Sequence, residues 1–181
     1  MDRSTPNTPH SPLNLILTGF MGTGKSTIGR LVSARLGRPF VDMDDEIARR
    51  AGQSIPAIFA TQGEAAFRQM ERDLCLELAG RRGLVIATGG GALLDPGNRA
   101  AMIAGGVVIC LTASPEALAA RLRGTSDRPL LAAADRAERI RELFAARAEA
   151  YAALPHHLDT TSLSPEATVE AVLELWARHS T

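Results

Sequence analysis

Short apolar runs alternate with amphipathic stretches along most of the chain. Each run is followed by a segment in which apolar residues recur with the period of a helix, as in Phe67, Met70, Leu74 and Leu78. The expected strands cover 13–18, 39–42, 84–88, 107–112 and 156–160. The expected helices cover 26–36, 44–50, a short turn at 55–60, 63–80, segments starting at 96 and 115, 135–153, and a last segment starting at 165.

Five short strands interleaved with helices predict an α/β protein with a five-stranded parallel sheet and helices on both faces. Residues 124–134 fit neither period and lie between two helices, so we expect a mobile lid there. The chain shows no internal repeat and no long linker. We therefore expect one domain over 13–181, preceded by a flexible tail at 1–12.

Composition narrows the class of protein. The 181 residues are 45% hydrophobic and carry no net charge, so a disordered chain is excluded and no nucleic-acid partner is expected. No apolar run reaches the roughly 18 residues of a membrane span, and the tail lacks the apolar core of a signal peptide. These features predict a cytoplasmic protein without membrane contact, in which Cys75 and Cys110 are buried, reduced thiols.

A phosphate-binding loop occupies Gly19–Ser26, where GFMGTGKS satisfies the pattern G-x-x-x-x-G-K-[ST] between a strand and a helix. Glycines let successive N–H groups point at phosphate oxygens, and the following helix adds its free N-terminal N–H groups. Lys25 is the only lysine, against nineteen arginines, which indicates that a compact ammonium is required. The motif predicts ATP or another nucleoside triphosphate with Mg²⁺ on the Ser26 hydroxyl. The nucleotide-binding residues are Gly22, Thr23, Gly24, Lys25, Ser26 and Thr27.

The loop alone leaves the acceptor open, because GTPases, ATPases and small-molecule kinases share it. No N-K-x-D guanine motif is present, and no apolar strand after residue 80 ends in aspartate. The nearest carboxylate is Asp42, at the end of an early strand. Asp42 and Asp44 are two residues apart, so in an extended backbone they face the same side, one toward a metal and one toward an acceptor. The alternative is that this acidic cluster only caps a helix.

Three further features are candidates for a binding or catalytic role. Arg68 and Glu71 share a helix face, although a solvated ion pair would give the same spacing. Gly89–Gly91 follow a buried strand and leave room for a ligand against bare backbone. Arg128 lies in the expected lid, and Arg147 lies late in the next helix, where a surface arginine is the alternative.

Five segments in series resemble the signatures of the shikimate kinases. They are GFMGTGKST, VDMDDEI, IFATQGEAAFRQME, ATGGGALL and DRPLL, and the likeness covers about 13–176. The resemblance implies the P-loop NTPase fold in its nucleoside-monophosphate-kinase-like form. It also implies ATP-dependent phosphorylation of the 3-hydroxyl of shikimate, in chorismate and aromatic amino acid biosynthesis, by a monomer that binds one Mg²⁺.

The resemblance also implies residue roles. Asp44, Arg68, Arg147 and the glycines Gly89, Gly90 and Gly91 would hold the acceptor, and Glu71 would orient Arg68. Asp44 would also contact the attacking hydroxyl. Lys25 and Arg128 would neutralise the transferring phosphoryl group, and Ser26 with Asp42 would serve Mg²⁺. Arg121 and Pro165 would enclose adenine.

One departure affects the acceptor site. Members of this family usually have Arg-x-Pro-Leu-Tyr where this chain has RAEAY at 147–151, so the proline and leucine are missing, and Ala152 replaces a frequent second arginine. Two other functions remain open: a kinase of the same fold for another small hydroxyl acceptor such as gluconate, and a ligand-sensing module without turnover. The set Asp44, Arg68 and Arg147 favours a carboxylated cyclic polyol.

Overall fold

The computed structural model describes residues 12–122 and 136–180. The expected tail at 1–12, apart from Pro12, lies outside these residues. So do the expected lid at 124–134, with Arg128, and the expected capping residue Asp135.

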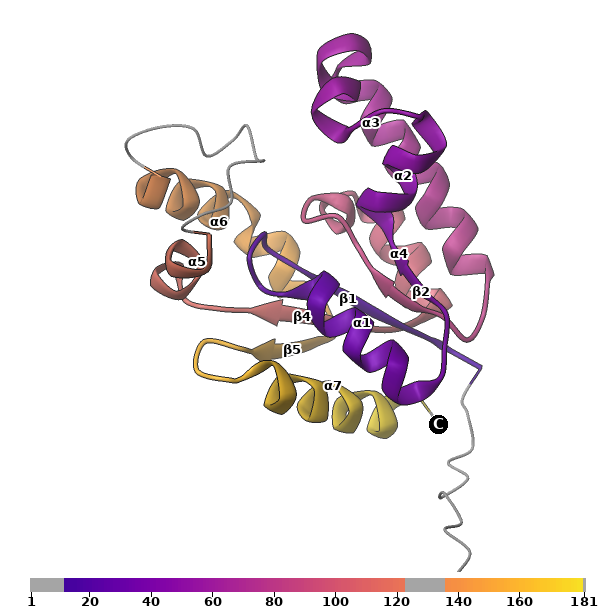
Figure 1. Cartoon of the computed structure of the whole chain (residues 1–181), viewed down its shortest axis with the longest axis vertical. Coiled ribbons are helices and arrows are strands. Elements are labelled where there is room, and N and C mark those ends of the chain that lie inside the picture. The colour runs from indigo at the N-terminus through magenta and orange to yellow at the C-terminus, as the bar shows by residue number, and fades with distance from the viewer. Residues whose placement is uncertain (1–11, 123–135, 181) are drawn as a thin grey trace, which may run out of the picture.

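A five-stranded sheet forms the centre of the molecule (Figure 1). Its strands lie in the order β2-β3-β1-β4-β5, and every neighbouring pair is parallel, as predicted. Parallel strands require crossover helices, which explains the alternating pattern of the sequence. The strands are β1 (Asn14–Gly19), β2 (Phe40–Asp42), β3 (Val85–Ala87), β4 (Gly106–Thr112) and β5 (His156–Asp159).

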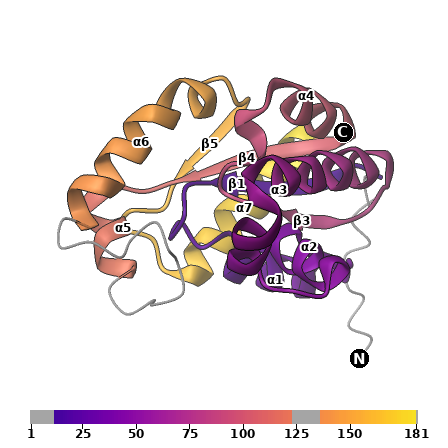
Figure 2. The same ribbon diagram turned by 90° about the horizontal axis from the view of Figure 1, so that it is seen from above.

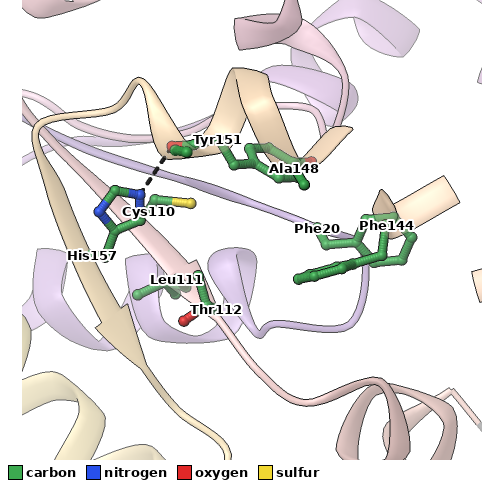
Figure 3. A pocket seen from close by; sticks show the side chains of 9 residues that line it. Phe20, Cys110, Leu111, Thr112, Phe144, Ala148, Tyr151 and His157 are labelled. Carbon is green, nitrogen blue, oxygen red and sulfur yellow. Dashed lines mark hydrogen bonds between the residues drawn. The ribbon is translucent and has the colours of Figure 1, made fainter. Parts of the chain in front are cut away.

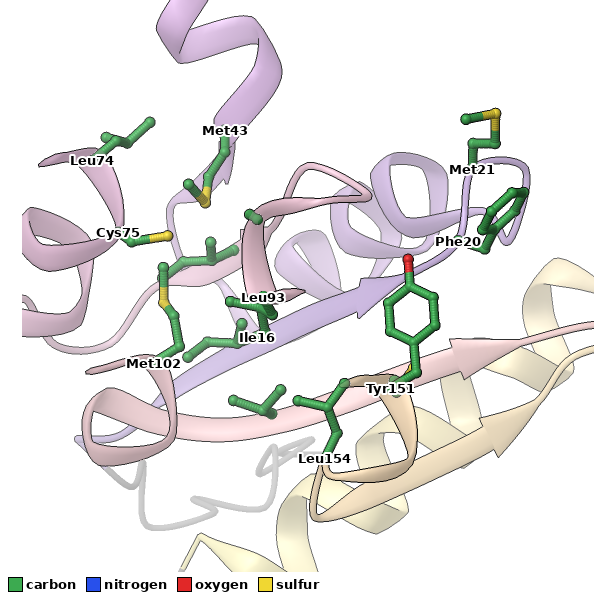
Figure 4. Packing of buried hydrophobic residues seen from close by; sticks show 14 of the residues in the cluster. Ile16, Phe20, Met21, Met43, Leu74, Cys75, Leu93, Met102, Tyr151 and Leu154 are labelled. Atoms are coloured by element: carbon green, nitrogen blue, oxygen red, sulfur yellow. The ribbon is translucent and has the colours of Figure 1, made fainter. Parts of the chain in front are cut away.

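Helices cover both faces of the sheet (Figure 2). One hydrophobic cluster joins helices α1 and α7 to β1, β3 and β4, and includes Val32, Val172 and Trp176. A larger cluster joins α2–α6 to the opposite face (Figure 4). The helices are α1 (Lys25–Leu36), α2 (Met43–Ala51), α3 (Ile55–Gly80), α4 (Pro96–Gly105), α5 (Pro115–Arg121), α6 (Arg136–Ala152) and α7 (Pro165–His179), with a 3₁₀ turn, η1, at Ala92–Leu94.

One local expectation is corrected. Asp42 and Asp44 do not lie on one extended segment, because α2 already begins at Met43 and Asp42 is its N-cap. The Asp42 carboxylate accepts hydrogen bonds from the backbone N–H groups of Asp44 and Asp45, which stops the strand and starts the helix. The expected short turn and the expected helix at 63–80 are confirmed instead: α3 consists of two helical segments that meet at Gly63, whose φ of 83° is not helical.

Other local signals are confirmed. Ser114, Ser164 and Asp95 cap the helices that follow them, each with proline at the first helical turn. Cys75 and Cys110 are buried and unbonded, and burial raises the pKa of Cys75 to about 12 and that of Cys110 to about 11. Within the described residues, no helix has the length and apolar character needed to cross a membrane.

Candidate active site

The phosphate-binding loop lies between β1 and α1, at the carboxyl end of the central strand. Gly19 begins it with φ at 133°, and a Cβ there would lie 2.2 Å from the carbonyl oxygen of Leu111 on β4. No other residue fits that position. Gly24 ends the loop with φ at 93° as the N-cap of α1, so it offers no capping side chain and leaves the first helical N–H groups available to an anion.

Lys25 folds back over this loop. Its Nζ donates hydrogen bonds to the carbonyl oxygens of Gly19 at 2.8 Å and Phe20 at 3.0 Å. The Thr23 hydroxyl donates to the same Phe20 oxygen at 2.8 Å. The ammonium is thereby held above the loop's backbone, where a bound phosphate would meet it.

Ser26 and Asp42 meet beside the loop. The Ser26 hydroxyl donates to Asp42 Oδ2 at 2.5 Å, while Asp42 Oδ1 caps α2. Hydroxyl and carboxylate oxygens are the ligands that Mg²⁺ prefers, so this pair suits a magnesium ion that also contacts phosphate. Among the described residues, no group of three or more His, Cys, Asp or Glu side chains is arranged to hold a metal.

A second group of side chains surrounds the glycines that follow β3. A Cβ built on Gly89 would lie 2.8 Å from both Asp44 Oδ1 and Glu71 Oε1, so two carboxylates from different helices face one bare backbone position. A Cβ on Gly91 would lie 3.0 Å from Arg68 Nη1. Asp44, Arg68, Glu71 and the glycines therefore share one region, as the sequence predicts.

Arg68 is fixed by two acids on α3. Its Nη1 donates to Glu71 Oε2 at 2.5 Å, and its Nη2 donates to Glu64 Oε1 at 3.1 Å. The Glu71 side chain is only 3% exposed, whereas Arg68 is 36% exposed. Burial raises the pKa of the Glu71 carboxyl, and the hydrogen bond and charge of Arg68 oppose that rise by favouring the carboxylate. The pair is therefore more than the solvated ion pair that its spacing alone would allow.

Arg147 approaches the same glycines from α6. Its Nη1 donates to the carbonyl oxygen of Gly90 at 3.4 Å, and its guanidinium carbon lies 5.5 Å from the centre of the Phe20 ring. Arg147 is therefore partly buried and packs against the glycine loop, instead of extending freely into solvent. The hydroxyl of Tyr151 donates to the same Gly90 oxygen at 2.6 Å. Sequence reasoning noted Tyr151 as part of a motif but gave it no role, because its partner is 61 residues away.

Arg121 is held on the other side of the phosphate loop, at the end of α5. It donates to the hydroxyl of Thr160 at 3.1 Å and to the carbonyl oxygen of Thr160 at 2.5 Å. The turn that begins at Thr160 leads to Pro165, the first residue of α7. Arg121 is therefore hydrogen-bonded to the segment that leads to Pro165, the residue expected to enclose adenine with it. Arg128 lies outside the described residues.

A cavity of about 360 Å³ lies between α6 and strands β4 and β5 (Figure 3). None of the residues predicted to bind nucleotide or acceptor lines it, but it adjoins the site through Phe20 and Tyr151, which contact Arg147 and Gly90. Its lining consists of Phe20, Cys110, Leu111, Thr112, Phe144, Ala148, Tyr151, Ala152 and His157.

The sequence of this chain is similar to those of shikimate kinases over most of its length. The family model for shikimate kinase matches residues 21–177. The shikimate kinase of Geobacter sulfurreducens is 43% identical over 171 residues, which cover 94% of each chain. That of Desulforudis audaxviator is 49% identical over 161 residues, which cover 89% of this chain and 85% of the relative.

Solved structures agree. The shikimate kinase from Acinetobacter baumannii in complex with shikimate superimposes with a TM-score of 0.86 at 35% identity, over 92% of this chain and 93% of that one. A gluconokinase from Sinorhizobium meliloti superimposes with a TM-score of 0.60 at 17% identity, over 94% and 95% of the two chains, which is a likeness of fold alone.

Proposed function

The chain belongs to the shikimate kinase family, and we propose that the residues gathered around its phosphate loop and its glycine loop carry out that family's reaction. The reaction is the ATP-dependent phosphorylation of the 3-hydroxyl of shikimate, giving shikimate 3-phosphate and ADP. The chain is thus a kinase with an alcohol acceptor, acting in aromatic amino acid biosynthesis. The observation that carries the assignment of residues is the meeting of Asp44, Arg68 and Arg147 at one glycine loop.

The acceptor site combines the guanidinium groups of Arg68 and Arg147 with the carboxylate of Asp44, while the carboxylate of Glu71 is paired with Arg68. Arg68 and Arg147 offer guanidinium groups that can bind a carboxylate in bidentate fashion, and Glu71 orients Arg68 for that contact. Asp44 offers an oxygen that can accept hydrogen bonds from hydroxyl groups. A ring that carries a carboxylate at one end and hydroxyls at the other matches this distribution of charge, and the glycines let it lie against the backbone.

The transfer step is mostly positioning and electrostatics. Asp44 accepts a hydrogen bond from the attacking hydroxyl and takes its proton as the new P–O bond forms, while ADP leaves with the electron pair of the broken P–O bond. Lys25 and the backbone N–H groups of the loop stabilise the charge on the phosphoryl oxygens. We assign the same role to Arg128, and we propose that the segment 124–134 acts as a lid which excludes water during transfer.

The fit between Ser26 and Asp42 supports a single Mg²⁺ at this site. A bound Mg²⁺ would offset the charge of the phosphate oxygens. The Ser26 hydroxyl would hold it directly, and Asp42 would hold it through water while it keeps its capping contacts. Arg121 and Pro165 are proposed to enclose adenine. We further propose that residues 13–181 act as one domain, in a cytoplasmic monomer that binds neither nucleic acid nor membrane.

The roles of Arg68 and Arg147 can be tested with a modified acceptor. Shikimate methyl ester keeps the ring and its hydroxyls but lacks the negative charge. We expect its KM to be at least a hundredfold higher than that of shikimate, since charge-assisted bidentate pairs contribute several kcal/mol. Equal KM values for ester and acid would contradict the assignment of the two arginines.

A further inference from the structure

Tyr151 makes hydrogen bonds through both its backbone carbonyl and its side-chain hydroxyl. Its ring is buried, with 6% of the residue exposed, and its backbone oxygen lies 2.9 Å from His157 Nε2 (Figure 3). The side chain points from the end of α6 toward Phe20 (Figure 4), and its hydroxyl donates to the Gly90 oxygen at 2.6 Å. The hydroxyl thus reaches the glycine loop at Gly89–Gly91, although the ring is part of the hydrophobic core.

Arg147 reaches the same oxygen because α6 is continuous. The helix extends from Arg136 to Ala152, and within it Arg147 and Tyr151 are four residues apart, so they lie on one face. A carbonyl oxygen has two lone pairs, and Gly90 uses them for these two donors. The bonds are unequal, because 2.6 Å is a short hydroxyl bond and 3.4 Å is near the limit for a hydrogen bond.

The inequality matters because Arg147 has a second task under the proposed function. Only Nη1 of the guanidinium contacts Gly90, at 3.4 Å, and a turn toward an incoming carboxylate breaks this long contact first. If Arg147 were the carbonyl's only partner, that move would leave a partly buried oxygen without a donor, which costs about 1–3 kcal/mol. With Tyr151 in place, the oxygen keeps its stronger bond.

We propose that Tyr151 is a positioning residue for the acceptor: its hydroxyl satisfies the Gly90 carbonyl so that Arg147 is free to bind the carboxylate. This inference rests on the proposed function. The hydroxyl is a constant donor across the working pH range, because burial raises the pKa of Tyr151 to about 12, with the charge of Arg147 and a hydrogen bond from Arg147 opposing the rise.

Tyr151→Phe is the sharpest test, since it removes one oxygen and keeps the buried ring. We expect the KM for shikimate to rise about three- to tenfold, the equivalent of one net hydrogen bond, with kcat and the KM for ATP within twofold of wild type. The matched control is Ser33→Ala, which removes a hydroxyl that donates to the Arg38 carbonyl at the same 2.6 Å, at the far end of α1. It should change neither KM.

A double-mutant cycle separates positioning from general loosening. In an Arg147→Ala background there is no guanidinium to release, so Tyr151→Phe should lower kcat/KM for shikimate by less than twofold. An unchanged KM in the single variant, an equal rise in both KM values, or a full effect in the Arg147→Ala background would each overturn the inference. Wild-type protein that does not phosphorylate shikimate would instead overturn the proposed function, so the two failures are distinguishable.

A second measurement needs no substitution of the side chain. Tyr151 is the only tyrosine of the chain, so labelling with 3-fluorotyrosine gives one ¹⁹F resonance from this residue. Shikimate should shift that resonance as Arg147 leaves the shared oxygen, and a nucleotide analogue alone should not. A resonance that shikimate leaves in place would also overturn the inference.

Discussion

Replacing Gly89 by alanine should damage the acceptor site without affecting the nucleotide site. The new methyl carbon would lie 2.8 Å from an oxygen of Asp44 and an oxygen of Glu71, whereas ordinary contact begins at 3.4 Å. Both carboxylates must therefore retreat by about 0.6 Å. The backbone of Gly89 lies outside the left-handed region, so the whole effect comes from this contact.

The size of the effect follows from the packing around Gly89. Both atoms are ends of side chains and can shift, so the cost lies at the lower end of the range for overpacking, about 1 kcal/mol in the free energy of unfolding, which lowers Tm by about 2–4 °C. Movement of Glu71 also disturbs its 2.5 Å hydrogen bond to Arg68. Displacements of about 1 Å near reacting groups can reduce the rate a hundredfold, so we expect at least a tenfold loss in kcat/KM for shikimate.

Thermal melts and steady-state kinetics with each substrate varied in turn would measure both effects. The KM for ATP should stay within twofold of wild type. The control is Gly80→Ala at the end of α3, where the same methyl group meets nothing within 4 Å and should not lower Tm. A Gly89→Ala protein with wild-type Tm and wild-type KM for shikimate would refute the proposed meeting of Asp44 and Glu71 at this glycine.

Three further predictions concern single side chains. Lys25→Arg should lower kcat about a hundredfold or more in a turnover assay, because a planar guanidinium cannot replace the compact ammonium over the loop, and activity within a few-fold of wild type would contradict this. Asp44→Asn should lower kcat strongly while a titration with a nucleotide analogue finds unchanged affinity; a large loss of nucleotide affinity would mean that Asp44 serves the metal. Hydrogen bonds from Arg49 and Arg50 lower the pKa of Glu46 to about 2 from 4.5, so Glu46 stabilises the fold above pH 4.5 and loses this contribution as the pH falls toward 2. In Glu46→Gln, the loss of unfolding free energy between pH 4.5 and pH 2 should therefore be smaller than in wild type by roughly 1 kcal/mol, a value limited by solvent screening. Denaturant melts at several pH values measure this loss, and an equal loss in both proteins would contradict the prediction.

Local signals predicted much of the fold. The Ser114-Pro115 and Ser164-Pro165 pairs mark helix starts, because the serine hydroxyl binds a backbone N–H that the helix leaves free. The alternation of apolar runs with helices predicted a parallel sheet for two reasons. Parallel strands are joined by crossover helices, and strands that helices cover on both faces are apolar throughout. The phosphate loop could be predicted because glycine spacing and the single lysine express its function directly.

The acceptor site was less accessible to sequence reasoning, since its contacts join distant segments. Asp44 was expected on an extended segment, but the carboxylate of Asp42 caps α2 and starts the helix one residue earlier. The close approach of Asp44 and Glu71 to Gly89 depends on how α2 and α3 pack against β3, which no local pattern encodes. The hydrogen bond from Tyr151 to Gly90 joins positions 61 residues apart, and it depends on how α6 packs beside the glycine loop.

The central claim is that this chain transfers a phosphoryl group from ATP to the 3-hydroxyl of shikimate. The most direct measurement is ADP release by the purified full chain with Mg²⁺ and ATP, in the presence of shikimate, of gluconate, or of no acceptor, with the product identified by ³¹P and ¹H NMR. We predict that ADP is released rapidly only when shikimate is the acceptor, and that the single product carries its phosphate on the 3-hydroxyl. Equal turnover with gluconate, equal ATP hydrolysis without an acceptor, or a phosphate on another hydroxyl would contradict the account.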